Sequence, residues 1–506
     1  MIATAEFRGL QVRHAALLAS MALVMPIAMA QTTTQGPGQA PAAGMGAARA
    51  AGSFPNPLAG VVYTPAIYID GGKYLVEKSV PADVSGGSVT NTEASGVKIT
   101  ARADKIGGLY VKGSEYTLSD ATIDLVGNSG QLDDNTGIGA GVVAGEGSTV
   151  TLKKVKITTN GLKAAAATAA GGTLKVYDST LIANGGKVPY ENTLIGTGPG
   201  YVGPPEPLGI TGNARATNVV GNSKAYYYNS TIIASGWGAM STDSASPAVY
   251  LEVNDSIVRV TDSGYGTYAD NGCIDVFNNT QFSSATYSGI ISGNGKIYFN
   301  NVTEDKAVNS VMIHGPGPDF TRIATLEIKG GKLATKEAVV LVKSHNADIV
   351  MDGVKLAPKS GVLLQSVIND SKRSAMARWL ASDKSTTPAT SPITGVRATF
   401  RNMSMSGNIV HDDTMRTMTL NLAGTTFKGA VTGSIYTITD VSIALDASSK
   451  WTATKDSRVT LMGGTDVKAF DAPKGVTITA IAGKDTTLKG SYKLPSGGTL
   501  TVKAPA

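Results

Sequence analysis

Two glycine-flanked blocks of this chain hold the side chains best suited to chemistry. They occupy residues 235–243 and 263–273. Their aromatic and acidic side chains are Trp237, Asp243, Tyr265, Tyr268 and Asp270. Cleavage of a glycosidic bond needs two carboxyl groups, because one protonates the leaving oxygen while the other acts as nucleophile or activates water. We therefore predict Asp243 and Asp270 as a catalytic pair.

The three aromatic residues beside this pair suit substrate binding. Aromatic rings flanked by glycine favour an exposed platform on which a sugar ring can stack, and a repeating core does not call for Gly-Trp-Gly or Gly-Tyr-Gly. Trp237, Tyr265 and Tyr268 are therefore expected to lie exposed beside the carboxylates.

Counting from a repeated turn residue aligns the two carboxylates. Asp243 lies 14 residues after Asn229, and Asp270 lies 15 residues after Asp255. These matched offsets place both carboxylates on one face, in neighbouring repeats. Two like charges raise the pKa of one carboxyl group, which suits a general acid.

Two basic residues follow the same count. His314 and Lys343 each lie 13 residues after a turn residue, Asn301 and Gly330 respectively. We expect both to line the same groove as the carboxylates and to bind substrate. A structural alternative stays open, in which the two carboxylates cap turns and His314 is simply exposed.

Other forms of chemistry find little support in the sequence. It has no HExxH, no CxxC and no Ser-His-Asp order, and the single cysteine, Cys273, excludes an intramolecular disulfide. The glycine-rich stretch 139–147 is not followed by a helix, so it does not fit a phosphate-binding loop. We predict no metal and no cofactor.

A short phrase recurs along the chain and must position these residues. It consists of an alternating apolar stretch, then Asn, Asp or Gly, then a small residue. The turn residues of the phrase are Asp120, Asp178, Asn229, Asp255, Asn278, Asn301, Gly330, Gly353, Asn402 and Gly424. From Asn229 to Gly353 and from Asn402 to Gly424 the steps are 22 to 29 residues. The steps from Asp178 to Asn229 and from Gly353 to Asn402, of 51 and 49 residues, are each either two coils or one coil with a long insertion.

This period, with strands and no helical pattern between the turns, is typical of a solenoid. We predict an all-β fold, a right-handed parallel β-helix with coils of about 22–26 residues over 61–506. Long insertions are expected near 187–215 and 370–392, and Arg373–Leu380 within the second could form a short amphipathic helix.

The amino terminus predicts export. Residues 1–30 read as a signal peptide that ends in Ala28-Met-Ala30, and residues 31–60 as a flexible linker. We expect a secreted or periplasmic protein, with the cell surface as a further location.

The formal charge of the whole chain is +6, and no Lys/Arg stripe or 18-residue apolar run occurs. A polysaccharide or cell-surface glycan is therefore expected as partner, without nucleic acid and without a membrane-spanning helix. The oligomeric state stays open.

From about residue 60 the chain resembles the right-handed parallel β-helix proteins of the pectin lyase-like superfamily. Its polygalacturonase-like members carry Asn-Thr-Asp, Asp-Asp, Gly-His-Gly and Arg-Ile-Lys in that order. This chain has Ser241-Thr-Asp243, Asp270-Asn271, Ile313-His-Gly315 and Arg322-Ile-Ala324. The resemblance implies Asp243 and Asp270 as the acid/base pair, with His314 and Arg322 binding substrate.

The last part of the chain is similar to a bacterial autotransporter passenger. The phrases that carry this likeness are Leu420–Gly429 and Trp451–Leu461. Two functions therefore compete. One is a secreted carbohydrate-active enzyme, a glycosidase or polysaccharide lyase, and the other is a non-catalytic, adhesin-like β-helix. The aromatic blocks favour the enzyme narrowly, because a scaffold has no use for them.

Overall fold

A computed structural model describes residues 60–505, apart from 81, 130–134, 187–202, 206–207, 244–247, 316–320, 369–394, 414–415 and 434–440. Within these ranges the regular structure is β-strand, apart from the 3-10 turns η1 (Val76–Lys78) and η3 (Val467–Ala469). The expected signal peptide, almost all of the linker, the expected helix at Arg373–Leu380 and most of the first insertion lie outside the described residues.

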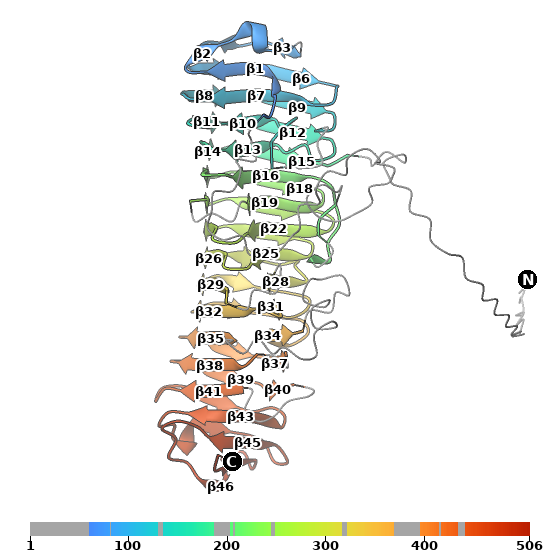
Figure 1. The fold of residues 1–506 in the computed structure, drawn as a ribbon. Helices are drawn as coiled ribbons and strands as arrows, with labels where there is room; N and C mark the ends of the chain where they lie inside the picture. Colours follow the sequence, from blue (N-terminus) through green and yellow to red (C-terminus); the bar gives the residue numbers. More distant parts are fainter. Residues whose placement is uncertain are drawn as a thin grey trace, which may run out of the picture. The chain divides into compact units, whose positions relative to one another are not determined.

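Sheet A is a ladder of fourteen strands (Figure 1). All neighbouring pairs are parallel except β2 and β1 at one end. In order across the sheet, the strands are β2 (Lys73–Tyr74), β1 (Thr64–Asp70), β7 (Ile106–Lys112), β10 (Val142–Ala144), β13 (Ala167–Ala170), β16 (Arg215–Val220), β19 (Trp237–Asp243), β22 (Gly264–Ala269), β25 (Tyr287–Ser292), β28 (Asn309–His314), β31 (Val340–Lys343), β34 (Val362–Val367), β37 (Asn408–Asp412) and β40 (Val431–Thr432).

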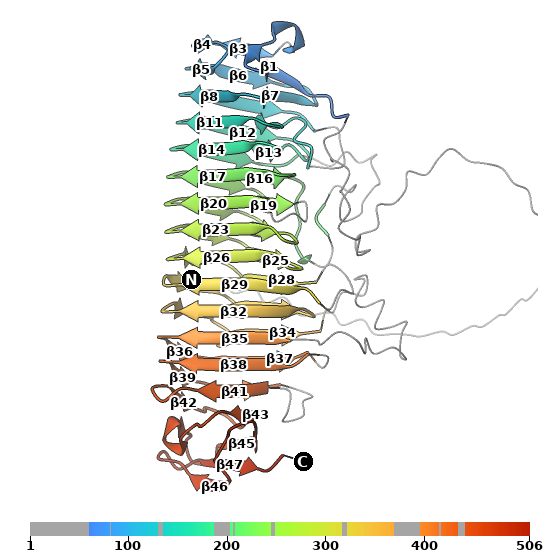
Figure 2. The same cartoon turned by 60° about the vertical axis from the view of Figure 1, so that its left-hand side comes forward.

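Sheet C is a second parallel ladder that runs from β5 to β47 (Figure 2). The antiparallel strand β4 pairs with β5 at one end, and the antiparallel strand β46 pairs with β47 at the other. Its strands are β4 (Ser88–Val89), β5 (Glu93–Ser95), β8 (Glu115–Ser119), β11 (Thr149–Lys153), β14 (Thr173–Tyr177), β17 (Lys224–Tyr228), β20 (Tyr250–Asn254), β23 (Ile274–Asn278), β26 (Lys296–Asn300), β29 (Ile323–Lys329), β32 (Asn346–Asp352), β35 (Val396–Arg401), β38 (Met418–Ala423), β41 (Val441–Leu445), β43 (Ser457–Met462), β45 (Thr477–Ala482), β46 (Gly490–Lys493) and β47 (Thr499–Lys503).

Sheet B has eleven strands, and a separate sheet of four strands takes its place in the later coils. The strands of sheet B are β3 (Asp83–Ser85), β6 (Lys98–Ala101), β9 (Thr122–Val126), β12 (Lys156–Asn160), β15 (Thr180–Ala183), β18 (Thr231–Ala234), β21 (Ile257–Val260), β24 (Gln281–Ser284), β27 (Thr303–Glu304), β30 (Lys332–Leu333) and β33 (Lys355–Leu356). The four-stranded sheet consists of β36 (Ser404–Ser406), β39 (Thr426–Lys428), β42 (Lys450–Thr452) and β44 (Phe470–Asp471).

The chain visits the sheets in the order A, C, B and then returns to sheet A. Strands β7, β8 and β9 make one such coil, and β10 then pairs in parallel with β7. The fold is therefore a right-handed parallel β-helix, which confirms the predicted fold class. The antiparallel strands at both ends cover edges that would otherwise offer unpaired backbone groups.

The two long steps in the repeat are each one coil with an insertion. Strand β14 pairs directly with β17, so that Leu174 lies beside Ala225. Strand β32 likewise pairs directly with β35, so that Ile349 lies beside Ala398. No extra coil intervenes in either case, which settles the alternative that the sequence left open.

The repeated turn adopts the left-handed backbone angle that its residue types predicted. Positive φ values occur at Asp120, Asp178, Asn229, Asp255, Asn301, Gly330, Gly353, Asn402 and Gly424. In one coil this angle falls on Asn279 and not on the expected Asn278. The amide of Asn301 donates to Asn279 Oδ1 at 3.0 Å, and the amide of Asn279 donates to Asp255 Oδ1 at 3.0 Å. Side-chain hydrogen bonds thus tie successive turns together.

The interior of the solenoid is mostly apolar, but Asp275 of β23, in sheet C, points into it. Leu251, Asp275 and Ile297 occupy the same inward position of three neighbouring strands. The fully buried carboxyl group of Asp275 accepts hydrogen bonds from Thr242 Oγ1 at 2.8 Å and Thr267 Oγ1 at 2.5 Å. Burial raises the pKa of Asp275 to about 7, although these two hydrogen bonds oppose the shift.

Glu304 is a second acid in the core, on β27. Burial raises the pKa of Glu304 to about 7, and the hydroxyl groups of Ser288 and Ser310 oppose the shift. Because a buried carboxylate without its hydration shell is costly, both groups favour the neutral acid in the folded state.

Because Asp275 and Glu304 favour the neutral form in the folded state, we predict that the free energy of unfolding falls as the pH rises. The folded state keeps protons that an unfolded chain with an ordinary Asp pKa of 3.8 releases, so the contribution of Asp275 is complete below about pH 4. This contribution of Asp275 to the free energy of unfolding is lost as the pH rises through about 7. It amounts to at most about 4 kcal/mol, since each pKa unit corresponds to ~1.4 kcal/mol. Urea unfolding of the wild type between pH 4 and 8 should show this decline.

The Asp275→Asn variant should decline less steeply with pH than the wild type, because Asn does not titrate. Asp262, an exposed carboxylate on the turn before β22, offers the matched control, since Asp262→Asn should keep the wild-type slope. An Asp275→Asn variant with an unchanged slope would show that Asp275 is ionised in the core.

Candidate functional site

The outer face of sheet A brings the two predicted carboxylates together. Thr242 on β19 pairs in register with Ala269 on β22, so Asp243 and Asp270 follow at neighbouring positions. Thr242 faces the core acid Asp275, and successive strand residues point to opposite faces, so Asp243 points outward. Neighbouring strands are about 4.8 Å apart, which places the two carboxylates side by side.

The environment of Asp270 favours its protonated form. Burial and then the charge of Asp243 raise the pKa of Asp270 to about 6. The backbone N–H of Asn271, the Ser292 hydroxyl and the Arg322 guanidinium oppose the shift without cancelling it. Asp270 still keeps some exposure to solvent, so it could reach a substrate.

Asp243 has a different environment, because it forms an ion pair with Arg215. The Arg215 side chain is 6% exposed and that of Asp243 is 19% exposed. Arg215 also donates from Nη2 to Asn135 Oδ1 at 3.0 Å, which fixes the guanidinium. The two carboxyl groups therefore have different environments, because a cation lies beside Asp243.

The same outward column continues through the next three strands. Ser292 of β25 pairs with His314 of β28, and His314 pairs with Lys343 of β31. The register therefore aligns His314 and Lys343 with the carboxylates, with Ser292 between Asp270 and His314.

His314 is 5% exposed, so the alternative in which it is simply exposed is wrong. Burial, followed by the charges of His345 and Lys343, lowers the pKa of His314 to about 3. The imidazole is therefore neutral near pH 7. Neither of its ring nitrogens has a hydrogen-bond partner among the residues that the structure describes.

Arg322 reaches the site through one intermediate residue. Its Nη1 donates to Asn271 Oδ1, and the Asn271 amide donates to Asp270 Oδ1 at 3.2 Å. Gly293 makes room for this contact, since a Cβ atom there would lie 1.6 Å from Asn271 Oδ1. Arg322 thus positions a neighbour of Asp270, and its charge acts on the carboxyl group.

The expected exposed platform of Trp237 and Tyr265 is wrong. Trp237 is 5% exposed and Tyr265 is 1% exposed. Both belong to a second apolar cluster, outside the solenoid core, that also contains Leu208, Ile210, Tyr287, Ile290 and Met312. Gly238 is needed because a Cβ atom there would lie 2.0 Å from the Tyr265 ring. The glycine allows the ring to pack closely and does not expose it.

Trp237 instead packs against two cations. Lys163 Nζ lies 4.2 Å from the centroid of the Trp237 ring, and the Arg215 guanidinium carbon lies 5.3 Å from it. Trp237 has a φ of 67°, an unusual angle for a bulky residue, and its backbone N–H donates to Thr211 O and Ser263 O. The ring therefore helps to hold Arg215 beside the carboxylates.

Tyr268 is the predicted aromatic residue that remains partly exposed. Its ring centroid lies 5.4 Å from that of Tyr265 and 6.4 Å from that of His314. Burial of the phenol group and the charges of Asp270 and Asp243 raise the pKa of Tyr268 well above its usual range. Tyr268 thus remains a neutral hydrogen-bond donor beside both carboxylates.

Three contributors to the site were missed by the sequence reasoning. Ser292 could have been found by the same count, since it lies 14 residues after Asn278. Arg215 is the last residue of the expected first insertion, so counting from the preceding turn does not reach it. Asp275 breaks the apolar pattern of Ile274–Asn278, and this break was the available signal.

No family model and no curated protein matches this chain.

Two further findings concern the described part of the chain. It contains no helix long and apolar enough to cross a membrane. Nor does any group of three or more His, Cys, Asp or Glu side chains come together there as a metal site would.

The geometry predicts that Asp243 controls the titration of Asp270. In the Asp243→Asn variant the pKa of Asp270 should fall from about 6 toward its ordinary value, because one of the two causes of its rise is removed. Carboxyl-carbon NMR over a pH series measures this shift. Asp262→Asn is the control and should leave the Asp270 titration unchanged, whereas an unaltered pKa in Asp243→Asn would contradict the pairing.

Proposed function

We propose that the outer face of sheet A binds and cleaves a polysaccharide, with Asp270 as general acid and Asp243 as nucleophile or base. The observation that supports this best is the pair of adjacent carboxyl groups with opposite environments. One has a pKa raised to about 6, and the other is paired with Arg215. Paired titratable groups whose environments differ in this way are typical of acid/base catalysis.

His314, Lys343 and Tyr268 are proposed to bind the substrate beside this pair. A buried polar group without a hydrogen bond costs about 1–3 kcal/mol, so the His314 imidazole favours a ligand that supplies one. A sugar hydroxyl can both donate and accept such a bond. Arg322 is proposed to act on Asp270 through Asn271, and Trp237 and Tyr265 to brace the site from beneath.

The test is a panel of purified polysaccharides, with both reducing ends and unsaturated products measured. Asp243→Asn and Asp270→Asn should each reduce turnover by roughly 10²- to 10⁴-fold, because each removes an essential acid or base. Turnover by the wild type should also decline as the pH rises through about 6, since Asp270 then loses the proton that it must donate. Asp262→Asn should retain full turnover. Equal activity in all three variants would exclude this site.

We also propose a relation to the pectin lyase-like superfamily, supported by the right-handed β-helix and by the order of the four motifs. The likeness of the later coils to an autotransporter passenger supports a second candidate, a non-catalytic, adhesin-like protein. The burial of Trp237 and Tyr265 favours this candidate, because it removes the aromatic platform expected at a catalytic groove.

Export to the periplasm, the medium or the cell surface is proposed for either function. Its support is the basic start, short apolar stretch and Ala28-Met-Ala30 of the sequence. Amino-terminal sequencing of the protein from its native host should give a start near Gln31. A mature protein that still carries Met1 would contradict export.

A further inference from the structure

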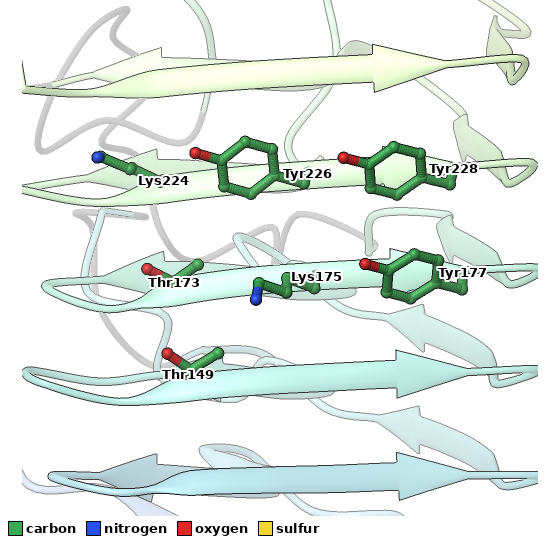
Figure 3. A pocket seen from close by; sticks show the side chains of 7 residues that line it. All are labelled: Thr149, Thr173, Lys175, Tyr177, Lys224, Tyr226 and Tyr228. Atoms are coloured by element: carbon green, nitrogen blue, oxygen red, sulfur yellow. The ribbon is translucent and has the colours of Figure 1, made fainter.

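Partly exposed tyrosines and two lysines gather on the outer face of sheet C, whereas the site described above lies on sheet A. We call Lys175, Tyr177, Lys224, Tyr226 and Tyr228 the tyrosine–lysine patch. With Thr149 and Thr173 they line an open hollow of about 480 Å³ (Figure 3). The hollow spans three neighbouring strands, β11, β14 and β17.

Strict register builds the patch from three columns of outward side chains. Thr173 pairs with Lys224, Lys175 with Tyr226, and Tyr177 with Tyr228. The rings of Tyr177 and Tyr228 stack, with centroids 5.0 Å apart and planes inclined by 8°. All three tyrosines of the patch remain partly exposed. Their rings therefore give the surface an ordered apolar strip with hydroxyl groups at its margin.

The two lysines of the patch are not paired with acidic side chains in the part of the chain that the structure describes. Neither Lys175 nor Lys224 has an ion pair or a side-chain hydrogen bond there. Glu252 of the next coil lies beside Tyr226 and accepts from Tyr250 OH at 2.8 Å and from the Asn254 amide at 3.1 Å, so its single charge offsets only part of the charge of the two lysines. The ammonium groups of Lys175 and Lys224 can therefore bind an anionic ligand.

We propose that the tyrosine–lysine patch binds a segment of an acidic polysaccharide. The C–H faces of a pyranose match the apolar rings, its hydroxyl groups match the tyrosine and threonine hydroxyls, and its carboxylates match the two lysines. The open hollow suits a polymer that continues along the sheet. This binding site is separate from the carboxylates on sheet A and does not depend on the proposed cleavage.

The experiment measures binding of the full chain to polygalacturonate and alginate by calorimetry at low salt. The Asp243→Asn/Asp270→Asn double variant serves as the background, so that turnover at sheet A cannot consume the ligand. Fully methyl-esterified polygalacturonate, which keeps the backbone but not the charge, should bind at least about tenfold more weakly.

The Lys175→Gln/Lys224→Gln variant should lose about tenfold in affinity for the acidic polymers alone. Tyr226→Ala should lose about tenfold for the acidic and esterified polymers alike.

Matched controls lie three coils along the same columns. Lys296 and Tyr298 of β26 occupy the register positions of Lys224 and Tyr226 but lie outside the hollow. Lys296→Gln and Tyr298→Ala should leave the affinity unchanged. Absence of binding to both acidic polymers, equal losses in the control variants, or tighter binding of single-stranded oligonucleotides would each overturn the proposal. Absence of cleavage by the wild type, with this binding intact, would refute only the function proposed for sheet A.

Discussion

Hydrogen bonding in register between successive coils is the constraint on which the rest of this structure depends. Each coil repeats its neighbour at a distance of about 4.8 Å, so residues separated by one coil become lateral neighbours. Asp243 and Asp270 share a face for this reason alone. A slip of one residue in β19 would turn Asp243 into the core and bring Thr242 outside. Register thus creates the candidate site and the tyrosine–lysine patch alike.

The wall of the solenoid is one strand thick, so a charge on its outer side influences the ionisation of an acid on its inner side. Thr242 holds the core acid Asp275, while the next residue, Asp243, lies outside beside Arg215. The charge of Asp243 also contributes to the raised pKa of Asp275. The acidic groups at this level therefore share an electrostatic environment, in which protonation of one favours ionisation of the others.

Features that depend on periodicity could be predicted from the sequence. The turn residues and the column of Asp243, Asp270, His314 and Lys343 follow from counting, because the coil length varies little in this region. The burial of Trp237 could not be predicted, since glycine beside an aromatic residue serves an exposed ring and a tightly packed ring equally well. Arg215 was missed because a long insertion separates it from the preceding turn, and only the pairing of the strands restores the count.

The central claim is that Asp243 and Asp270 act together in cleaving a polysaccharide. The most direct test compares the cleavage rate of the Asp243→Asn/Asp270→Asn double variant with the rates of the two single variants. If the two carboxyl groups act as one acid/base unit, either single substitution already removes the shared mechanism. The double variant should then lose about as much activity as each single variant. A loss equal to the product of the two single losses would show independent residues and would contradict the proposed pair.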